Sequence, residues 1–298
     1  MVSWDCLHPE SRVTTVTAEP ILKSMKSAEP MECIDQGNDP VIDRVKTGII
    51  GLDELIEGGF PRNSLNLVAG PAGSGKTLMG IQYIYNGARE FDEKGVYITL
   101  EESRDNILRA VRRYHIDFES LENNLKLLLM DMGTIRLMAS RGTITRMFDH
   151  QRDLESQIIE TGIIDFEALQ MLLAGEQGIL ATTGATRLVI DSVTALGLHY
   201  TSVEDLRLDM FRFSRFLKEH KVTCLLITES IEGQYLTRYG IEQFMTDSFI
   251  VLRLENQRGE LRRTLNVRKM RFTNHDSAIH PYIITQNGME ISSKDRVY

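Results

Sequence analysis

The residues best suited to chemistry in this sequence form a glycine-rich loop that can bind phosphate. The loop fits the pattern G-x-x-x-x-G-K-T and consists of Gly70, Pro71, Ala72, Gly73, Ser74, Gly75, Lys76 and Thr77. Its glycines let successive backbone N–H groups turn inward around phosphate oxygens, and its lysine reaches the β- and γ-phosphates. Its threonine hydroxyl is a ligand for Mg²⁺. The loop therefore predicts that a nucleoside triphosphate binds together with Mg²⁺.

Carboxylates that follow apolar runs are candidates for the rest of the site. Asp191 ends the run Leu188–Ile190, where an acid can take part in the Mg²⁺ shell. Glu101 and Glu102 follow Val96–Leu100, and a carboxylate in that position can orient a water for attack on the γ-phosphate. Successive side chains at a strand end point to opposite faces, so at most one of the two glutamates faces the phosphate. The alternative is a solvated acidic turn at the start of a helix.

Two further polar pairs follow later apolar runs. Thr228–Glu229 ends the run Thr223–Ile227 and is a candidate phosphate sensor. Lys269 and Arg271 lie two residues apart in a run typical of a strand, so their side chains share one face. Two cations placed in this way repel each other. They form either a solvated edge or a pair that is supplied to the triphosphate of a neighbouring subunit.

These residues require elements that hold them at one edge of a sheet. Runs rich in Val, Ile and Leu with little alternation are typical of parallel strands buried on both faces, and they occur at Leu65–Ala69, Val96–Leu100, Leu125–Met130, Arg187–Ile190, Thr223–Ile227 and Phe249–Leu254. Apolar residues at helical spacing predict helices over Thr77–Glu90, Ser103–Tyr114 and Ser202–Glu219. The alternation predicts a doubly wound α/β fold with ligands at the carboxyl ends of the strands. Hairpin strands are expected to extend the sheet over Arg262–Met270, Pro281–Thr285 and Met289–Ser292.

Composition narrows the classes of function. The chain of 298 residues has 34 basic and 42 acidic residues, and its formal net charge of −8 argues against non-specific binding to nucleic acid or to an anionic membrane. The scattered cysteines Cys6, Cys33 and Cys224 predict neither a disulfide framework nor a metal knuckle. The sequence shows no stretch with the length of a membrane span and no apolar secretory core at its N-terminus. A cytoplasmic enzyme is therefore expected.

The sequence predicts one main domain over 45–298, preceded by an extension over 1–44. The extension contains four of the seven prolines and no sustained periodicity, so it is expected to be partly disordered. Residues 134–178 of the main domain are an uncertain insert with recurring arginines, namely Arg136, Arg141, Arg146 and Arg152. These arginines form either a patch for nucleic acid or an acidic partner, or part of a solvated loop and helix. The second reading is favoured because no aromatic stacking platform accompanies them.

Taken together, these motifs resemble the KaiC-like branch of the RecA superfamily of ATPases, from about Val45 to Ser292. Besides the loop at 70–77, the resemblance rests on motifs that follow one another in a single order, Thr47–Phe60, Thr99–Glu102, Val189–Thr194, Arg238–Phe244, Thr246–Asp247 and Lys269–His275. It implies a RecA-like P-loop NTPase fold, in which helices flank a mostly parallel twisted sheet that ends in a C-terminal antiparallel extension. It also implies a single-domain ATPase that uses ATP and Mg²⁺ and forms a ring, commonly a hexamer, with ATP at the subunit interfaces.

The resemblance also implies roles for individual residues. Glu101 and Glu102 match the family's catalytic glutamate pair. Tyr114 lies near the position where the family packs a residue on the adenine. In the family, certain residues reach the nucleotide of the next subunit, and their counterparts here are Lys269, Arg271 and His275.

Two positions depart from the family's pattern. The phosphorylatable pair of the two-domain clock proteins would fall on Gln243 and Phe244, so autophosphorylation of the clock type is not expected. Phe272 stands where a glycine usually follows the arginine, which predicts a changed interface loop.

Three functions fit these observations. The leading hypothesis is an ATP-hydrolysing regulatory or signalling ATPase with a protein partner. The second is a RecA- or RadA-type ATPase of DNA recombination or repair, which would contact DNA through Glu229–Asp247 and the arginines of 136–152; the acidic net charge weighs against it. The third is a platform on which nucleotide assembles a ring and a partner does the work.

Overall fold

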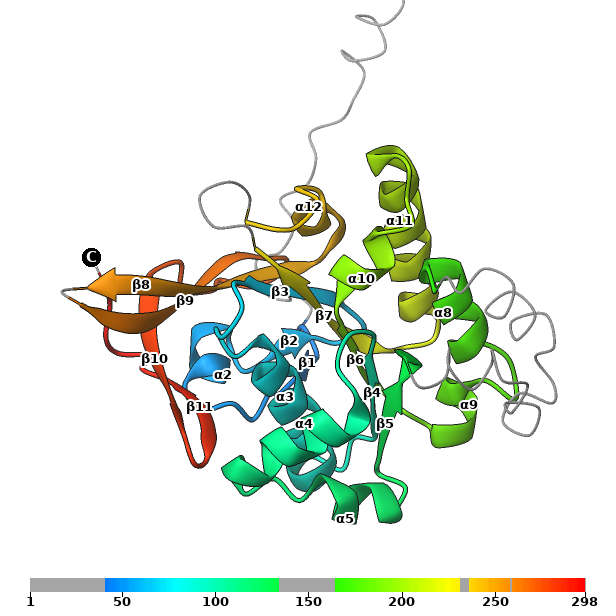
Figure 1. Ribbon diagram of the computed structural model, residues 1–298, viewed down its shortest axis with the longest axis horizontal. Coiled ribbons are helices and arrows are strands. Elements are labelled where there is room, and N and C mark those ends of the chain that lie inside the picture. The colour runs from blue at the N-terminus through cyan, green and yellow to red at the C-terminus, as the bar shows by residue number, and fades with distance from the viewer. Residues whose placement is uncertain (1–40, 134–163, 231–235, 258, 298) are drawn as a thin grey trace, which may run out of the picture. The chain divides into compact units, whose positions relative to one another are not determined.

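The computed structural model describes residues 41–133, 164–230, 236–257 and 259–297 (Figure 1). Ile42–Tyr298 form one compact unit. Most of the predicted extension over 1–44 lies outside the described residues. Residues 134–163 of the predicted insert also lie outside them, and so do the four arginines on which a nucleic-acid patch would depend.

One sheet of nine strands organises the described part of the chain, in the order β11-β10-β9-β8-β3-β7-β6-β4-β5. The strands from β5 to β8 run parallel. They are β3 (Leu65–Gly70), β4 (Gly95–Thr99), β5 (Leu127–Asp131), β6 (Arg187–Asp191), β7 (Thr223–Glu229) and β8 (Ser248–Gln257). The predicted parallel sheet is therefore confirmed. The predicted start of β5 at Leu125 is wrong, because Leu125 is exposed and adopts a left-handed backbone with φ of 57°.

Helices cover both faces of these strands (Figure 1). Side chains alternate along a strand, so the sheet contributes to two cores. Val68 and Tyr97 belong to the first core, which is covered by α3 (Lys76–Glu90), α4 (Arg104–Val111) and α5 (Phe118–Asn123). Leu67 and Ile98 belong to the second core, which is covered by α8 (Phe166–Leu173), α9 (Ile179–Thr183), α10 (Val193–Gly197) and α11 (Val203–Glu219). Among the described helices, none has the length and apolar surface that crossing a membrane requires.

The predicted C-terminal hairpin strands are also confirmed. They are β9 (Glu260–Met270), β10 (Ile279–Thr285) and β11 (Gly288–Ile291), and they extend the sheet antiparallel from β8. Gln82 of α3 holds the tip of the last hairpin, because its amide oxygen accepts the Met289 N–H at 2.7 Å. The last hairpin is therefore fastened to the helix that follows the glycine-rich loop.

The predicted motif Thr47–Phe60 packs on the first core through its apolar side chains. It contains α2 (Leu52–Leu55) and is closed by the short pair β1 (Arg44–Val45) and β2 (Phe60–Pro61). The Asp53 carboxylate accepts the backbone N–H of Thr47 at 2.9 Å and that of Gly48 at 3.1 Å. The conformation of this segment therefore depends on one aspartate, whose side chain satisfies two backbone donors.

Candidate nucleotide-binding site

The glycine-rich loop lies between β3 and α3, as its sequence predicts. Gly73 and Gly75 have φ values of 80° and 90°, a left-handed conformation that glycine adopts without steric cost. A Cβ atom at Gly75 would lie 3.0 Å from Ile284 Cδ1, so the loop is also closely packed from outside. Ser74 holds the turn from within, because its hydroxyl donates to the Pro71 carbonyl at 2.8 Å. The loop is thus preformed as a cradle for phosphate.

Lys76 begins α3 and folds over the loop. Its ammonium donates to the Pro71 carbonyl at 3.0 Å. Burial lowers the pKa of Lys76, while the nearby carboxylates of Asp191, Glu229 and Glu101 act in the opposite direction. A cation held beneath the phosphate cradle suits the β- and γ-phosphates of a nucleotide.

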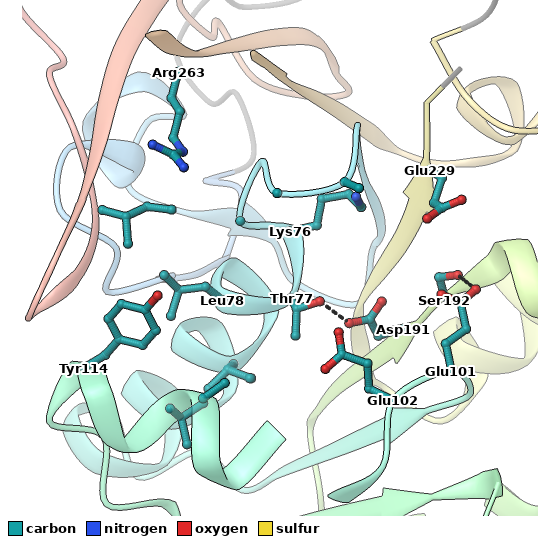
Figure 2. A pocket seen from close by; sticks show the side chains of 17 residues that line it. Lys76, Thr77, Leu78, Glu101, Glu102, Tyr114, Asp191, Ser192, Glu229 and Arg263 are labelled. Carbon is teal, nitrogen blue, oxygen red and sulfur yellow. Dashed lines mark hydrogen bonds between the residues drawn. The ribbon is translucent and has the colours of Figure 1, made fainter. Parts of the chain in front are cut away.

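Thr77 and Asp191 form the candidate metal pair. The Thr77 hydroxyl donates to Asp191 Oδ2 at 2.8 Å (Figure 2). The Tyr97 hydroxyl donates to the same oxygen at 2.6 Å. Burial raises the pKa of Asp191, and the two hydroxyl donors oppose that shift. Hydroxyl and carboxylate oxygens are ligands that Mg²⁺ accepts, and they fit a cation that keeps several waters and binds through phosphates. The described residues contain no group of three or more His, Cys, Asp and Glu side chains that could hold a metal ion.

Glu101 and Glu102 point to different sides of the site, as expected for neighbours at a strand end. Glu101 Oε1 accepts a hydrogen bond from the Ser192 hydroxyl at 2.6 Å, whereas Glu102 points towards Thr77 and Asp191 (Figure 2). The turn that carries them is fixed by Thr99, whose hydroxyl donates to the Glu102 carbonyl at 2.8 Å and accepts its N–H at 3.1 Å. The Glu101 carboxylate therefore contacts Ser192, whereas that of Glu102 lies near Thr77 and Asp191.

A cavity of about 570 Å³ joins these groups. Its polar end contains the loop, both glutamates, Asp191, Ser192 and Glu229. Its other end is mostly apolar and is lined by Leu78, Ile81, Ala110, Val111, Tyr114 and Ile284. Tyr114 belongs to the 3₁₀ turn η1 (Arg112–Tyr114), which follows α4, so the helix predicted over Ser103–Tyr114 changes type at its end. A cavity with a phosphate cradle at one end and an apolar slot at the other fits a nucleotide.

Arg263 lines the apolar end and is a residue that sequence reasoning missed. It extends from β9 into the space near Leu78 and Tyr114 (Figure 2). Its Nε is buried and has no hydrogen-bond partner within the described residues. A buried donor without a partner carries a desolvation cost that a ligand acceptor could relieve. In the sequence, Arg263 is one arginine in a run of charged residues on a hairpin strand, so nothing singles it out.

Lys269, Arg271 and His275 do not line this cavity. The Lys269 ammonium donates to the carbonyls of Gln243 at 3.0 Å and Thr246 at 2.6 Å. Burial and the charge of Arg271 lower the pKa of Lys269.

The register of the sheet explains this separation. Met270 pairs with Ser248, and Ser248 pairs with Asn66, whereas the loop begins at Gly70, four positions further along β3. The end of β9 therefore lies about 13 Å from the loop along the strand direction, on the opposite edge of the sheet. Its two cations therefore lie away from the phosphate-binding loop of their own chain.

The described part of Glu229–Asp247 is held by a buried carboxylate. Glu242, in the short helix α12 (Glu242–Met245), accepts the N–H of Tyr239 at 3.1 Å and the hydroxyl of Thr228 at 3.2 Å. Glu242 is completely buried, a role that the sequence did not indicate. The segment that would contact DNA in the recombinase hypothesis is thus anchored beside Glu229, and residues 231–235 of it lie outside the described part.

Comparisons with known proteins agree with this geometry. The family model described as "ATPase: KaiC" matches residues 45–296. The chain is 33% identical over 271 residues to the circadian clock oscillator protein KaiC of Synechococcus elongatus, covering 90% of this chain and 47% of that protein. It is likewise 33% identical over 254 residues to the circadian clock oscillator protein KaiC 1 of Synechocystis, covering 84% of this chain and 44% of that protein. The chain thus spans about half the length of the curated relatives it matches.

A solved structure gives the same result for the fold. The crystal structure of a KaiC-like protein from the hyperthermophilic archaeon Pyrococcus horikoshii matches with a TM-score of 0.65 and 33% sequence identity. The match covers 84% of this chain and 99% of that one.

Proposed function

Because this chain belongs to the KaiC family of ATPases, we propose that it binds ATP with Mg²⁺ and hydrolyses it. The observation that carries the proposal is the arrangement around Asp191. The Thr77 hydroxyl lies at hydrogen-bond distance from Asp191, and Glu101 lines the same polar end of the cavity. Thr77 and Asp191 would hold Mg²⁺, which supplies positive charge to the phosphate oxygens.

The residues of the cavity divide the work in this proposal. Glu101 accepts from Ser192 at Oε1, and no hydrogen bond from another described residue reaches Oε2, which would orient a water and accept its proton. Ser192 keeps this carboxylate in place. Glu102 lies beside Thr77 and Asp191, and its carboxylate would supply a further oxygen near the Mg²⁺ ion. Lys76 stabilises the charge on the β- and γ-phosphates.

The base and ribose would occupy the apolar end of the cavity. Tyr114 offers a ring on which adenine can pack, and Arg263 offers donors to the nucleotide. Arg263 lies on a strand of the sheet and Tyr114 packs against the first core, so the slot is largely preformed.

We further propose that the active site is shared between subunits of a ring, commonly a hexamer. Among the residues lining the described cavity, the cations are Lys76 and Arg263. Lys269, Arg271 and His275 lie outside it and would reach the triphosphate of the neighbouring copy instead. An arginine supplied in this way typically raises the hydrolysis rate by about 10³–10⁵.

The process that this ATPase would serve is regulatory or signalling, with a protein partner. In this proposal residues 45–298 are the ATPase domain, 1–44 an extension and 134–178 an insert. Clock-type autophosphorylation is not part of it, because Gln243 and Phe244 carry no hydroxyl group. DNA recombination is not favoured, since the net charge is −8 and the relatives described above are circadian clock proteins and a KaiC-like protein.

The test is ATP hydrolysis by wild type, Lys76→Ala, Glu101→Gln and Glu102→Gln across a range of Mg²⁺ concentrations. Lys76→Ala should lose nucleotide binding. Glu101→Gln should bind ATP normally and lose at least about 100-fold in turnover, as expected for loss of a general base. Glu102→Gln should raise the Mg²⁺ concentration that half-saturates turnover. Undiminished turnover in both Lys76→Ala and Glu101→Gln would contradict the proposal.

A further inference from the structure

Phe272 is an exposed aromatic residue in strained backbone, directly after the strand that carries Lys269 and Arg271. Its φ is 58°, a left-handed conformation that is unfavourable for a bulky L-residue. Its side chain is 72% exposed, so packing within its own chain does not repay the strain. Strain of this kind persists where the surrounding structure imposes it, and it often accompanies a functional contact.

The surrounding structure does impose this conformation. Arg44 donates to the Phe272 carbonyl at 3.2 Å and to the Thr273 hydroxyl at 2.9 Å. The Arg271 N–H donates to the Asp247 carbonyl at 2.9 Å on the other side. The backbone is thus held before and after Phe272, while the phenyl ring is left in solvent.

A second exposed aromatic residue lies at the same edge of the sheet. Phe244 of α12 is 63% exposed and directly follows Gln243, whose carbonyl accepts the Lys269 ammonium. We call the set Phe244, Lys269, Arg271 and Phe272 the aromatic edge. Aromatic side chains together with arginine are typical of the centre of protein interfaces.

The nucleotide cavity has a surface of opposite charge. Its polar end carries four carboxylates, those of Glu101, Glu102, Asp191 and Glu229, against the one cation of Lys76, and a bound triphosphate would add further negative charge. The aromatic edge carries two cations, and although Asp247 pairs with Arg271 at 3.3 Å it also pairs with Lys218 at 3.1 Å, so the local charge stays positive. This edge lies at the opposite ends of the strands from the cavity. Two complementary surfaces at opposite sides of one chain favour head-to-tail contact between copies. These charges favour a second copy of this chain as the occupant of the aromatic edge.

We propose that Phe272, with Phe244 beside it, packs on a second copy at the mouth of its nucleotide cavity and thereby positions Lys269 and Arg271 at that copy's triphosphate. The inference rests on the shared active site proposed above and adds its apolar anchor. The phenyl ring excludes water around the two cations, which strengthens their attraction to phosphate. Phe272 is a positioning residue, because it acts through the cations.

The test compares Phe272→Gly with Leu125→Gly as a matched control. Leu125 is also apolar, 78% exposed and left-handed with φ of 57°, but it precedes β5 at the far side of the sheet. Both substitutions relieve the same strain, so the melting temperature of the nucleotide-free protein should not fall in either. Assembly with Mg-ATP is followed by light scattering against protein concentration.

Phe272→Gly should need about 10- to 100-fold more protein for half-assembly, the effect of losing one buried phenyl ring. Its turnover per subunit should be low in dilute solution and recover as protein concentration rises. Leu125→Gly should assemble as wild type does. Phe272→Asn, whose residue type tolerates left-handed backbone, should behave as Phe272→Gly does and serves where the glycine variant unfolds.

Assembly of both Phe272 variants at the wild-type concentration would overturn the inference, and so would an equal shift in Leu125→Gly. Wild type that neither assembles nor hydrolyses ATP would contradict the proposed function instead. The two failures are therefore distinguishable.

Discussion

Asp191 is the residue at which stability and function compete most directly. Its carboxylate accepts two hydroxyl donors, yet burial still raises its pKa, so the ionised form costs folding free energy when no cation is bound. Active sites commonly retain a destabilising buried charge of this kind, because ligand binding offsets the loss of stability. The nucleotide-free protein is thus expected to be less stable than its fold allows.

We predict that Asp191→Asn stabilises the protein in EDTA without nucleotide by about 1 kcal/mol at neutral pH. The amide oxygen can still accept from Thr77 and Tyr97, while the buried charge is removed. Urea unfolding of the two proteins measures the difference.

The pH dependence of that difference has a definite sign. Below the ordinary pKa of 3.8 the carboxyl is protonated in both the folded and the unfolded chain, so its ionisation costs nothing. The advantage of asparagine should grow as pH rises through the folded pKa of Asp191 and stay constant above it. An advantage that shrinks with rising pH would contradict this account.

Much of the site could be predicted at the level of residues. The loop at 70–77, Asp191 and the two glutamates were found because motif, strand and helix agree locally. Tyr97, Ser192 and Arg263 were not assigned roles, because their contacts depend on strands distant in sequence. Tyr97 meets Asp191 only because β4 and β6 are neighbours, and nothing in the sequence states that order.

At the scale of elements, the strand β9 contributes residues both to the nucleotide cavity and to the aromatic edge. Arg263 near its start lines the cavity of its own chain, whereas Lys269 near its end lies at the opposite edge of the sheet. The pairing of β9 with β8 shifts register between Phe249 and Ile250, so alternation in the sequence does not predict which face each residue takes. The strand itself was predicted, and its register was not.

The helix α3 approaches side chains of the sheet closely at Gly80 and Gly87. A Cβ atom at Gly87 would lie 2.4 Å from Arg187 Nε. Arg187 cannot move aside, because it is buried, pairs with Glu93, and lies with its guanidinium carbon 4.8 Å from the centre of the Tyr83 ring. The close approach of α3 to Arg187 therefore depends on the absence of a side chain at Gly87.

We predict that Gly87→Ala lowers the free energy of unfolding by about 1–3 kcal/mol through overpacking. Gly80→Ala in the same helix is the control, since the nearest atoms to a Cβ there, Ile227 Cδ1 and Val189 Cγ1, lie at 3.0 Å, against 2.4 Å at Gly87. Its cost should be smaller, because alanine also favours the helix. Chemical unfolding of both variants measures the contrast, and an equal loss in the two would refute the explanation.

At the scale of the whole molecule, one chain carries two different surfaces at opposite ends of its parallel strands. The carboxylate-rich cavity lies at the carboxyl ends of the parallel strands, and the aromatic edge lies at the other ends. The parallel α/β fold could be predicted from the order of apolar runs. The separation of the two surfaces could not, because it follows from how β8 and β9 join the sheet beside β3.

The measurement that tests the central claim most directly is ATP hydrolysis by a mixture of Arg271→Ala and Glu101→Gln. Each variant alone should be slow, because every site lacks either its own glutamate or the neighbour's arginine. In an equal mixture, about a quarter of the interfaces join an intact glutamate to an intact arginine, so turnover should recover to about a quarter of the wild-type value. Turnover equal to the average of the two separate variants would contradict a shared active site.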